Sequence, residues 1–286
     1  FRSGLRYAAD VTRDVARYRA HKMGFGTGEL AFASDAYELK DGVDTSHGRI
    51  EAWLSMRPPS RVLDLGCSDG ALGERLVAAG HEVVGVDVAE HKGVRERLTD
   101  FFQADLDQGI PEGVGGDYDV VLAADVLEHV RDPRAVLDQI RERLRPGGRL
   151  ITSIPNFGHW YPRTRVALGR FDYDARGILD HGHVRFFTKR SFARLAEASG
   201  WRIWRTEAVG LPLGVVDRGA ADHPAPTSAA GSEARGGRRG RLRDLVGTLD
   251  RGAVAVRPQL FAYQFLYEMA PAPPPEPDHT GVVTGP

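Results

Sequence analysis

Short apolar runs alternate with amphipathic stretches through the central part of the chain. The runs are rich in Val, Leu and Ile, which is typical of strands buried on both faces of a sheet. The stretches between them carry apolar residues at helical spacing. This alternation predicts an α/β fold, with a mostly parallel sheet and helices on both of its faces. The predicted strands are Arg61–Leu65, Glu82–Asp87, Phe101–Ala104, Tyr118–Ala124, Arg149–Ile154, Trp201–Val209 and Leu260–Met269.

Helix start and stop signals mark several of the intervening helices. The clearest helix spans Arg134–Arg145, with Asp132 as its cap and Pro146-Gly147-Gly148 as its end. Another is predicted at about Ser46–Ser55, and Thr188 caps a further helix before the sixth strand. Upstream of these, Leu5–Ala20 has the apolar spacing of an amphipathic helix and Met23–Gly28 is rich in glycine.

Composition shifts divide the chain into a main domain and less regular segments. Residues 157–187 interrupt the alternation and are rich in His, Tyr, Arg and Asp, so we expect a lid inserted into the domain. Residues 220–241 are biased to Ala, Gly, Arg and Pro, which favours a flexible insertion. The predicted parts are an N-terminal helical cap at 1–57, a main domain at 58–269, a lid insert at 157–187, a flexible insertion at 215–258 with a basic helix near 241–254, and a disordered tail at 270–286.

Charge and cysteine content exclude several classes of protein. The 286 residues include 38 basic and 39 acidic side chains, a balance that argues against a broad nucleic-acid or membrane footprint. No apolar run is long enough to span a bilayer. Cys67 is the single cysteine, so the chain has neither an internal disulfide framework nor a multi-cysteine zinc site. We expect a cytoplasmic protein that binds neither nucleic acid nor membrane.

The segment Val62-Leu-Asp-Leu-Gly-Cys-Ser-Asp-Gly70 has the pattern of a ligand-binding loop between a strand and a helix. Gly66 allows a tight turn and Gly70 a close packing where the helix begins. A dinucleotide-binding loop would carry glycine where Ser68 stands, and a pyrophosphate disfavours the acids Asp64 and Asp69. These features speak against a nicotinamide dehydrogenase and favour a ligand with an ammonium or sulfonium group.

Acidic residues also end the next three predicted strands. Asp87 stands 17 residues after Gly70, near the spacing of an acid that holds ribose hydroxyls. Asp105 can accept a hydrogen bond from an adenine amino group while Leu106 packs on the ring. Asp125 ends the fourth strand at the mouth of the same crevice.

Taken in order, these motifs resemble those of class I S-adenosylmethionine-dependent methyltransferases, over roughly residues 61–209. The motifs are VLDLGCSDG, VVGVDV, QADL, YDVVLAADVLEHV and LRPGGRLITSIPN. The resemblance implies a Rossmann-like, seven-stranded sheet and S-adenosyl-L-methionine as cofactor. It implies that the loop holds the methionine part, Asp87 the ribose, and Asp105 and Leu106 the adenine. The implied cofactor-binding residues are Asp64, Gly66, Cys67, Ser68, Gly70, Asp87, Val88, Asp105, Leu106 and Asp125.

Each of these residues also has a purely structural interpretation. Asp64 can anchor the loop, Asp87 can cap a helix, and Asp105 can stabilise a turn. Cys67 fits a small buried loop residue better than a nucleophile, since nothing near it in the sequence would activate it. The cofactor interpretation rests on the combination at these spacings.

The candidate residues for activating the methyl acceptor lie in the segment Asp125-Val-Leu-Glu128-His129 and at His183. Spacings of three and four would bring Asp125, Glu128 and His129 together on a helical turn. The pattern resembles ubiquinone-biosynthesis and small-RNA 2′-O-methyltransferases, in which an acidic-His cluster binds a divalent metal. The first acid there is Glu, and Asp125 is shorter, so a metal is the less favoured alternative. We assign His129 and His183 as the catalytic candidates, acting as general bases; the alternative for His129 is a residue that only steadies the crevice.

The chain most closely resembles MetW-type proteins of methionine biosynthesis in Ile154–Trp160 and Gln103–Gln108. We predict O-methylation of a hydroxyl on a small molecule or sugar. The alternative is a weakly catalytic, cofactor-binding partner subunit of another enzyme. Aromatic residues of the lid, such as Phe171 and Tyr173, either line the acceptor pocket or form a small core of their own.

Overall fold

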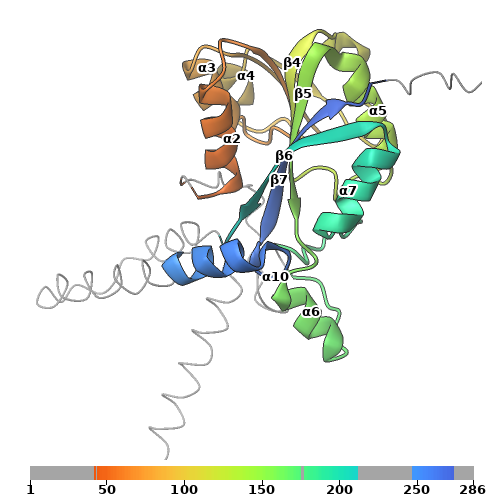
Figure 1. Ribbon diagram of the computed structural model, residues 1–286. Coiled ribbons are helices and arrows are strands. Elements are labelled where there is room, and N and C mark those ends of the chain that lie inside the picture. Colours follow the sequence, from red (N-terminus) through yellow and green to blue (C-terminus); the bar gives the residue numbers. More distant parts are fainter. Residues whose placement is uncertain (1–41, 43, 175–176, 212–246, 274–286) are drawn as a thin grey trace, which may run out of the picture.

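The computed structural model describes residue 42 and residues 44–174, 177–211 and 247–273. Helices and strands alternate along most of this part (Figure 1). The strands are β1 (Arg61–Leu65), β2 (Glu82–Asp87), β3 (Asp100–Gln103), β4 (Tyr118–Ala124), β5 (Leu144–Pro155), β6 (Trp201–Val209) and β7 (Gln264–Pro271). The helices are α2 (Ser46–Ser55), α3 (Ala71–Ala78), α4 (Val94–Arg97), the 3₁₀ turn η2 (Glu112–Val114), α5 (Pro133–Arg143), α6 (Trp160–Ala167), α7 (Lys189–Ala198) and α10 (Pro258–Phe261).

The strands form one seven-stranded sheet in the order β3-β2-β1-β4-β5-β7-β6. The contacts β1–β2, β1–β4, β2–β3 and β4–β5 are parallel, whereas β7 is antiparallel to both β5 and β6. The predicted α/β class with a mostly parallel, Rossmann-like sheet is confirmed. The strand order reverses between β1 and β4, so a crevice opens at the carboxyl ends of these two strands, where α/β sheets bind their ligands.

Both faces of the sheet are buried, because consecutive residues of a strand point to opposite faces. On one face Val62 packs in a cluster with Ile50 of α2. On the other, Leu63 packs in a cluster with Val136 of α5 and Phe192 of α7. Figure 1 shows α2, α3 and α4 on one side of the sheet and α5 and α7 on the other. This burial explains why the central strands β1, β2 and β4 are rich in Val and Leu.

Most of the predicted elements are confirmed. The bounds of α2, β1, β2, β4 and β6 agree with those predicted, and β3 lies one residue earlier. Oδ1 of Asp132 accepts the N–H groups of Arg134 and Ala135 at 3.0 and 3.2 Å, so it caps α5. Thr188 caps α7 as expected, through the N–H group of Ser191 at 3.2 Å.

Two predicted boundaries are wrong. Pro146-Gly147-Gly148 does not follow a helix that runs to Arg145, because α5 ends at Arg143 and these residues lie within β5. Leu144 already has extended dihedral angles and pairs with Tyr118, so the strand starts there. The last strand does not begin at Leu260. Pro258 has a fixed φ that suits the first position of a helix, so the start of this apolar run forms α10.

The structure differs from two C-terminal predictions at their ends. Of the predicted flexible insertion at 215–258, residues 247–256 are helical. This helix is packed on the domain, because Val254 is buried in the core and Oδ2 of Asp250 accepts the N–H group of Leu211 at 3.0 Å. Of the predicted tail at 270–286, Ala270 and Pro271 pair with β6 as part of β7. Residues 212–246 and 274–286 lie outside the described residues, as do the N-terminal helix at 5–20 and the glycine-rich stretch at 23–28.

The segment between β5 and α7 leaves the sheet and returns to it. The N–H group of Phe157 donates to the carbonyl of Phe187 at 2.8 Å, which closes the base of this excursion. Figure 1 shows α6, its one helix, beyond the carboxyl end of β5. Residues 157–187 therefore stand at the end of the sheet where the crevice opens. Among the described residues, no helix has the length and apolar character to span a bilayer.

Candidate functional site

The loop after β1 requires glycine at its first position. Gly66 has a φ of +71°, and its N–H group donates to the carbonyl of Val86 at 2.7 Å. A Cβ at this position would lie 2.6 Å from Cγ2 of Val126. Gly70 also has a positive φ, +78°, and starts α3. The turn brings the backbone and the N-terminal end of α3 to the mouth of the crevice.

Ser68 connects this loop to β2. It adopts a φ of +52°, in the left-handed region that favours glycine. Its N–H group donates to Oδ2 of Asp87 at 2.8 Å, while Oδ1 of Asp87 accepts the N–H group of Ala89 at 3.1 Å. Asp87 is half-buried. A carboxylate offers about four acceptor positions, so Asp87 holds its turn and retains acceptor capacity toward the crevice.

A pocket opens beside the loop. Asp64 is only 3% exposed in it. Burial raises the pKa of Asp64 to about 7, and the charge of Asp87 adds to the shift. A buried acid of this kind favours a ligand that carries a positive charge. The residues that line the pocket are His47, Asp64, Gly66, Cys67, Ser68, Asp69, Leu72 and Ala124.

The pocket includes one residue that the sequence interpretation missed. His47 lies on α2, is 6% exposed and reaches the pocket because α2 packs beside α3. No spacing in the sequence connects it to the loop. Two other pocket residues have structural roles: burial raises the pKa of the Cys67 thiol, which disfavours the reactive thiolate, and Asp69 forms an ion pair with Arg97 at 2.7 Å.

Val88 and the two residues predicted for the adenine, Asp105 and Leu106, lie at the ends of β2 and β3, outside the lining of this pocket. Val88 is 65% exposed, Asp105 is exposed and Leu106 is partly buried. Oδ1 of Asp105 accepts the N–H group of Asp107 at 2.9 Å, which is the turn role considered above. The amide of Gln103 donates to the carbonyl of Val88 at 3.0 Å and joins the two strand ends.

Asp125 does not belong to a helical turn with Glu128 and His129, as the spacing had predicted. It adopts a φ of +56°, and the residues after it form a turn. Its Oδ1 accepts hydrogen bonds from the hydroxyl of Ser153 at 2.7 Å and from the amide of Gln264 at 2.6 Å. Asp125 is thus held by β5 and β7 and lies outside the group of potential metal ligands described next.

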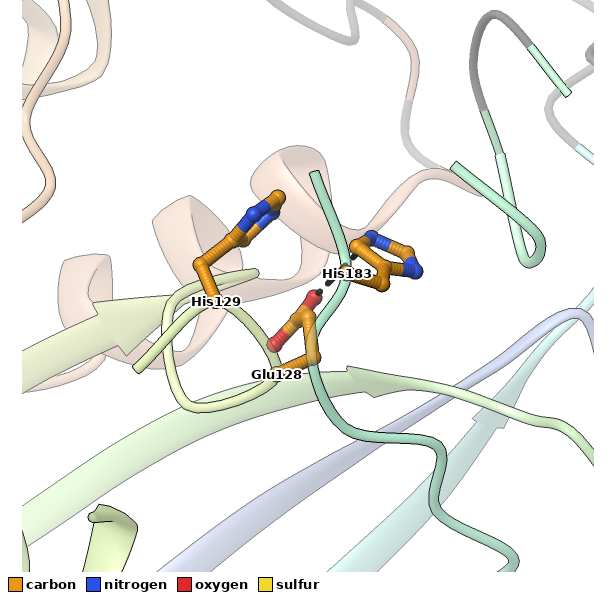
Figure 2. Close-up of side chains that lie close together, drawn as sticks. All are labelled: Glu128, His129 and His183. Atoms are coloured by element: carbon orange, nitrogen blue, oxygen red, sulfur yellow. Dashed lines mark ion pairs between the residues drawn. The ribbon is translucent and has the colours of Figure 1, made fainter. Parts of the chain in front are cut away.

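Glu128, His129 and His183 come together after β4 (Figure 2). We call these three residues the donor cluster, because one potential ligand atom from each lies within 4.8 Å of the others. Oε1 of Glu128 and Nε2 of His183 are 4.0 Å apart, and the two imidazole centroids are 4.7 Å apart. Glu128 and His183 are 1% and 6% exposed, whereas His129 is open to solvent.

Two backbone carbonyls fix the protonation of the imidazole rings. Nδ1 of His129 lies 3.0 Å from the carbonyl of Gly182, and Nδ1 of His183 lies 3.1 Å from that of Ile178. Because a carbonyl only accepts, the neutral form of either ring carries its proton on Nδ1 and a lone pair on Nε2. Burial, with the charge of His129 second, lowers the pKa of His183 to about 4, so this ring is neutral at pH 7.

The donor cluster has the chemistry of a proton acceptor and of a divalent metal site. A neutral imidazole with a free Nε2 is able to accept a proton or to bind a metal ion. A carboxylate beside it and backbone partners on the Nδ1 side are the usual surroundings of a ligating histidine. The donor set therefore fits a divalent ion, although it lacks the Asp125 carboxylate that the sequence pattern had placed with it.

Comparisons with known proteins concern the chain as a whole. The model of a family described as "Methyltransferase domain" matches residues 37–206, more than half of the chain. A ubiquinone biosynthesis O-methyltransferase of Aeromonas salmonicida is 30% identical over 157 residues, which cover 49% of this chain and 62% of that protein. The same enzyme of Aromatoleum aromaticum is 33% identical over 148 residues, covering 49% and 63%. The matches thus span less than two thirds of these relatives.

Two solved structures also match this chain, at TM-scores just under 0.5. The 1,6-didemethyltoxoflavin-N1-methyltransferase of Burkholderia thailandensis, solved with S-adenosylhomocysteine, has a TM-score of 0.49 and 17% identity, covering 80% of both chains. The magnesium protoporphyrin IX methyltransferase of Synechocystis has a TM-score of 0.47 and 19% identity, covering 91% of this chain and 94% of that one.

Proposed function

The chain belongs to the class I S-adenosylmethionine-dependent methyltransferases, and we propose that it transfers the methyl group to a hydroxyl of a small molecule. The donor cluster carries this proposal, because an oxygen acceptor needs a group that takes its proton, and the Nε2 atoms of the cluster face away from the carbonyls that hold Nδ1. The two relatives described above are named O-methyltransferases, which supports oxygen as the acceptor atom.

We assign the two ends of the cofactor to two parts of the crevice. The sulfonium and ammonium groups suit the pocket at Asp64, because a positive charge stabilises the ionised form of this buried carboxyl. Asp87 keeps acceptor capacity for the ribose hydroxyls. The adenine then lies toward Asp105 and Leu106. The full proposed set is Asp64, Gly66, Cys67, Ser68, Gly70, Asp87, Val88, Asp105, Leu106 and Asp125.

Methyl transfer from a sulfonium is an in-line displacement. The acceptor oxygen forms a bond to the methyl carbon while the carbon–sulfur bond breaks and its electron pair stays on sulfur. The hydroxyl proton passes to Nε2 of His129 or His183. The protein has to hold oxygen, carbon and sulfur in line and to exclude water. In this proposal His129, which is open to solvent, is the group that returns the proton to water.

A divalent ion is the alternative way to activate the hydroxyl. Glu128, His129 and His183 would hold it, in accord with their mutual distances. When bound, it would act as a Lewis acid that lowers the pKa of the acceptor hydroxyl. The three side chains would then orient the acceptor and keep the site dry.

Aromatic side chains of the insert support an acceptor pocket next to the donor cluster. The ring of Phe186 lies 6.2 Å from that of His183, centroid to centroid. Phe171 and Tyr173 lie 5.6 and 6.2 Å from Phe186 and are 49% and 47% exposed. Half-exposed rings that continue from the donor cluster offer a wall for the carbon skeleton of the acceptor.

The direct test is transfer of a labelled methyl group from S-adenosylmethionine to a panel of phenols, catechols and sugars. We expect an O-methylated product from at least one class, with the label on oxygen by mass spectrometry. Dialysis against a chelator separates the two modes of activation, since only the metal-assisted mode loses activity and regains it with Mg²⁺ or Mn²⁺. Cofactor binding without transfer to any acceptor would contradict the proposal and favour a partner-subunit role.

A further inference from the structure

The insert between β5 and α7 contains a buried ion pair. Nη1 of Arg165, on α6, lies 2.7 Å from Oδ1 of Asp174, and the two side chains are only 13% and 1% exposed. The hydroxyl of Tyr161 donates to Oδ2 of Asp174 at 2.8 Å. Burial is the main cause that raises the pKa of Tyr161 to about 12, so its hydroxyl remains a donor at neutral pH. Both carboxylate oxygens of Asp174 are therefore satisfied from α6.

The backbone of Asp174 in turn holds the residues that follow it. Its N–H group donates to the carbonyl of Leu179 at 2.7 Å. Its carbonyl accepts the N–H group of His181 at 3.2 Å. The oxygen Oδ1 of Asp180 then accepts the N–H group of Gly182 at 2.7 Å. Residues 177–183 are thus fixed relative to Asp174 at two points, and the contact of Asp180 with Gly182 holds the segment internally.

These same residues orient the donor cluster. His183 is itself part of the donor cluster, and its Nδ1 faces the carbonyl of Ile178. The carbonyl of Gly182 faces Nδ1 of His129, on the other side of the cluster. The Nδ1 protonation of both rings therefore depends on two carbonyls of one short segment, and this segment is held by Asp174.

We infer that Arg165, Tyr161 and Asp174 are positioning residues, which fix through residues 177–183 the ring orientation and the tautomer of His129 and His183. This inference rests on the proposed role of these histidines in accepting a proton or a metal. A buried ion pair is a costly way to hold a surface insert together, and removal of one partner leaves a buried charge uncompensated. The pair holds the segment whose carbonyls contact the two histidines. Reactive histidines in other sites are oriented by outer partners of the same kind.

A role that is only structural would leave the two rings as they are in any variant that stays folded. The tautomers of the two rings therefore distinguish a positioning role from a purely structural one. Two-bond ¹H–¹⁵N correlation spectra of the imidazoles distinguish a proton on Nδ1 from one on Nε2. At pH 7.5 we expect both His129 and His183 of the full chain to carry the proton on Nδ1.

The variants Arg165→Met and Asp174→Asn should convert both rings to a mixture of tautomers while the Kd of S-adenosylmethionine changes less than twofold. Tyr161→Phe removes a single donor and is the milder variant if the other two fail to fold; it should cause a partial change in the same direction. The matched controls are Arg163→Met, on the same helix and exposed, and Asp138→Asn, on α5, whose side chain is 60% exposed. Both should keep the wild-type spectra.

Unchanged Nδ1–H signals of both rings in folded Arg165→Met or Asp174→Asn would overturn the inference. Altered spectra in the two control variants would also overturn it, because the effect would then not be specific to the buried pair. A wild-type spectrum with the protons on Nε2 would instead contradict the proposed function, so the two failures are distinguishable.

Discussion

The N–H group of Ser68 donates to Oδ2 of Asp87 at 2.8 Å, so the loop after β1 and the acid at the end of β2 form one unit. This contact joins two segments that are 19 residues apart in the sequence. It places the Asp87 carboxylate at the mouth of the crevice beside the pocket that Asp64 lines.

Replacement of Asp87 by Ala should weaken S-adenosylmethionine binding by about tenfold or more. The variant removes the acceptor for the ribose hydroxyls, and a hydrogen bond to a charged group contributes about 1.5–3 kcal/mol. Calorimetric titration of the purified chain measures the change. Glu82→Ala is the matched control, because Glu82 lies at the opposite end of β2 with a 47% exposed side chain, and the Kd should stay within twofold. An unchanged Kd in Asp87→Ala would refute the ribose assignment.

Replacement of Gly66 by Ala should destabilise the fold more than the same change at Gly147. Both glycines have a positive φ, +71° and +83°. A Cβ at Gly66 would lie 2.6 Å from Cγ2 of Val126, whereas at Gly147 no atom lies within 4 Å. We expect a loss of about 1–2 kcal/mol from the dihedral strain alone at Gly147 and about 1–3 kcal/mol more at Gly66.

Urea denaturation of the two variants measures this difference. The second change Val126→Ala should restore part of the stability lost in Gly66→Ala, because it removes the atom that the new Cβ meets. Equal losses at the two glycines would show that the Val126 contact has no energetic effect.

Binding of S-adenosylmethionine should strengthen as the pH rises through about 7. Burial raises the pKa of Asp64 to about 7 in the free protein, and a cationic ligand favours the ionised form. Binding therefore lowers this pKa and releases a proton below pH 7, so the Kd should fall between pH 6 and pH 8. Calorimetry in buffers of different ionisation enthalpy counts the protons. Asp64→Asn should bind more weakly and lose this pH dependence; a Kd independent of pH in the wild type would contradict the assignment.

The sequence predicts the sheet well because its strands are buried on both faces. Runs of Val and Leu such as Val62–Leu65 and Val83–Val86 end at glycine or aspartate, so the bounds of β1 and β2 follow directly. The predicted bounds are wrong where a proline or a glycine is compatible with both a helix and a strand. Pro258 starts a helical turn inside an apolar run, and Gly147 lies within β5 rather than at the end of a helix.

Less of the candidate site follows from the sequence. Glu128, His129 and His183 are visible in the sequence pattern, and the structure brings them together. The separation of Asp125 from them depends on hydrogen bonds to Ser153 and Gln264, which are 28 and 139 residues away. His47 reaches the pocket only through the packing of α2, so local spacing carries no signal for it.

The donor cluster is the centre of this account, and a double variant tests it most directly. The labelled methyl group should reach a hydroxyl acceptor with wild-type protein, and His129→Ala/His183→Ala should lower this rate about 10²- to 10⁴-fold, the usual contribution of general acid–base catalysis. The Kd of S-adenosylmethionine should change less than twofold in the same sample, and His181→Ala, whose side chain is 77% exposed, should behave as wild type. Methyl transfer at an undiminished rate in the double variant would contradict the account.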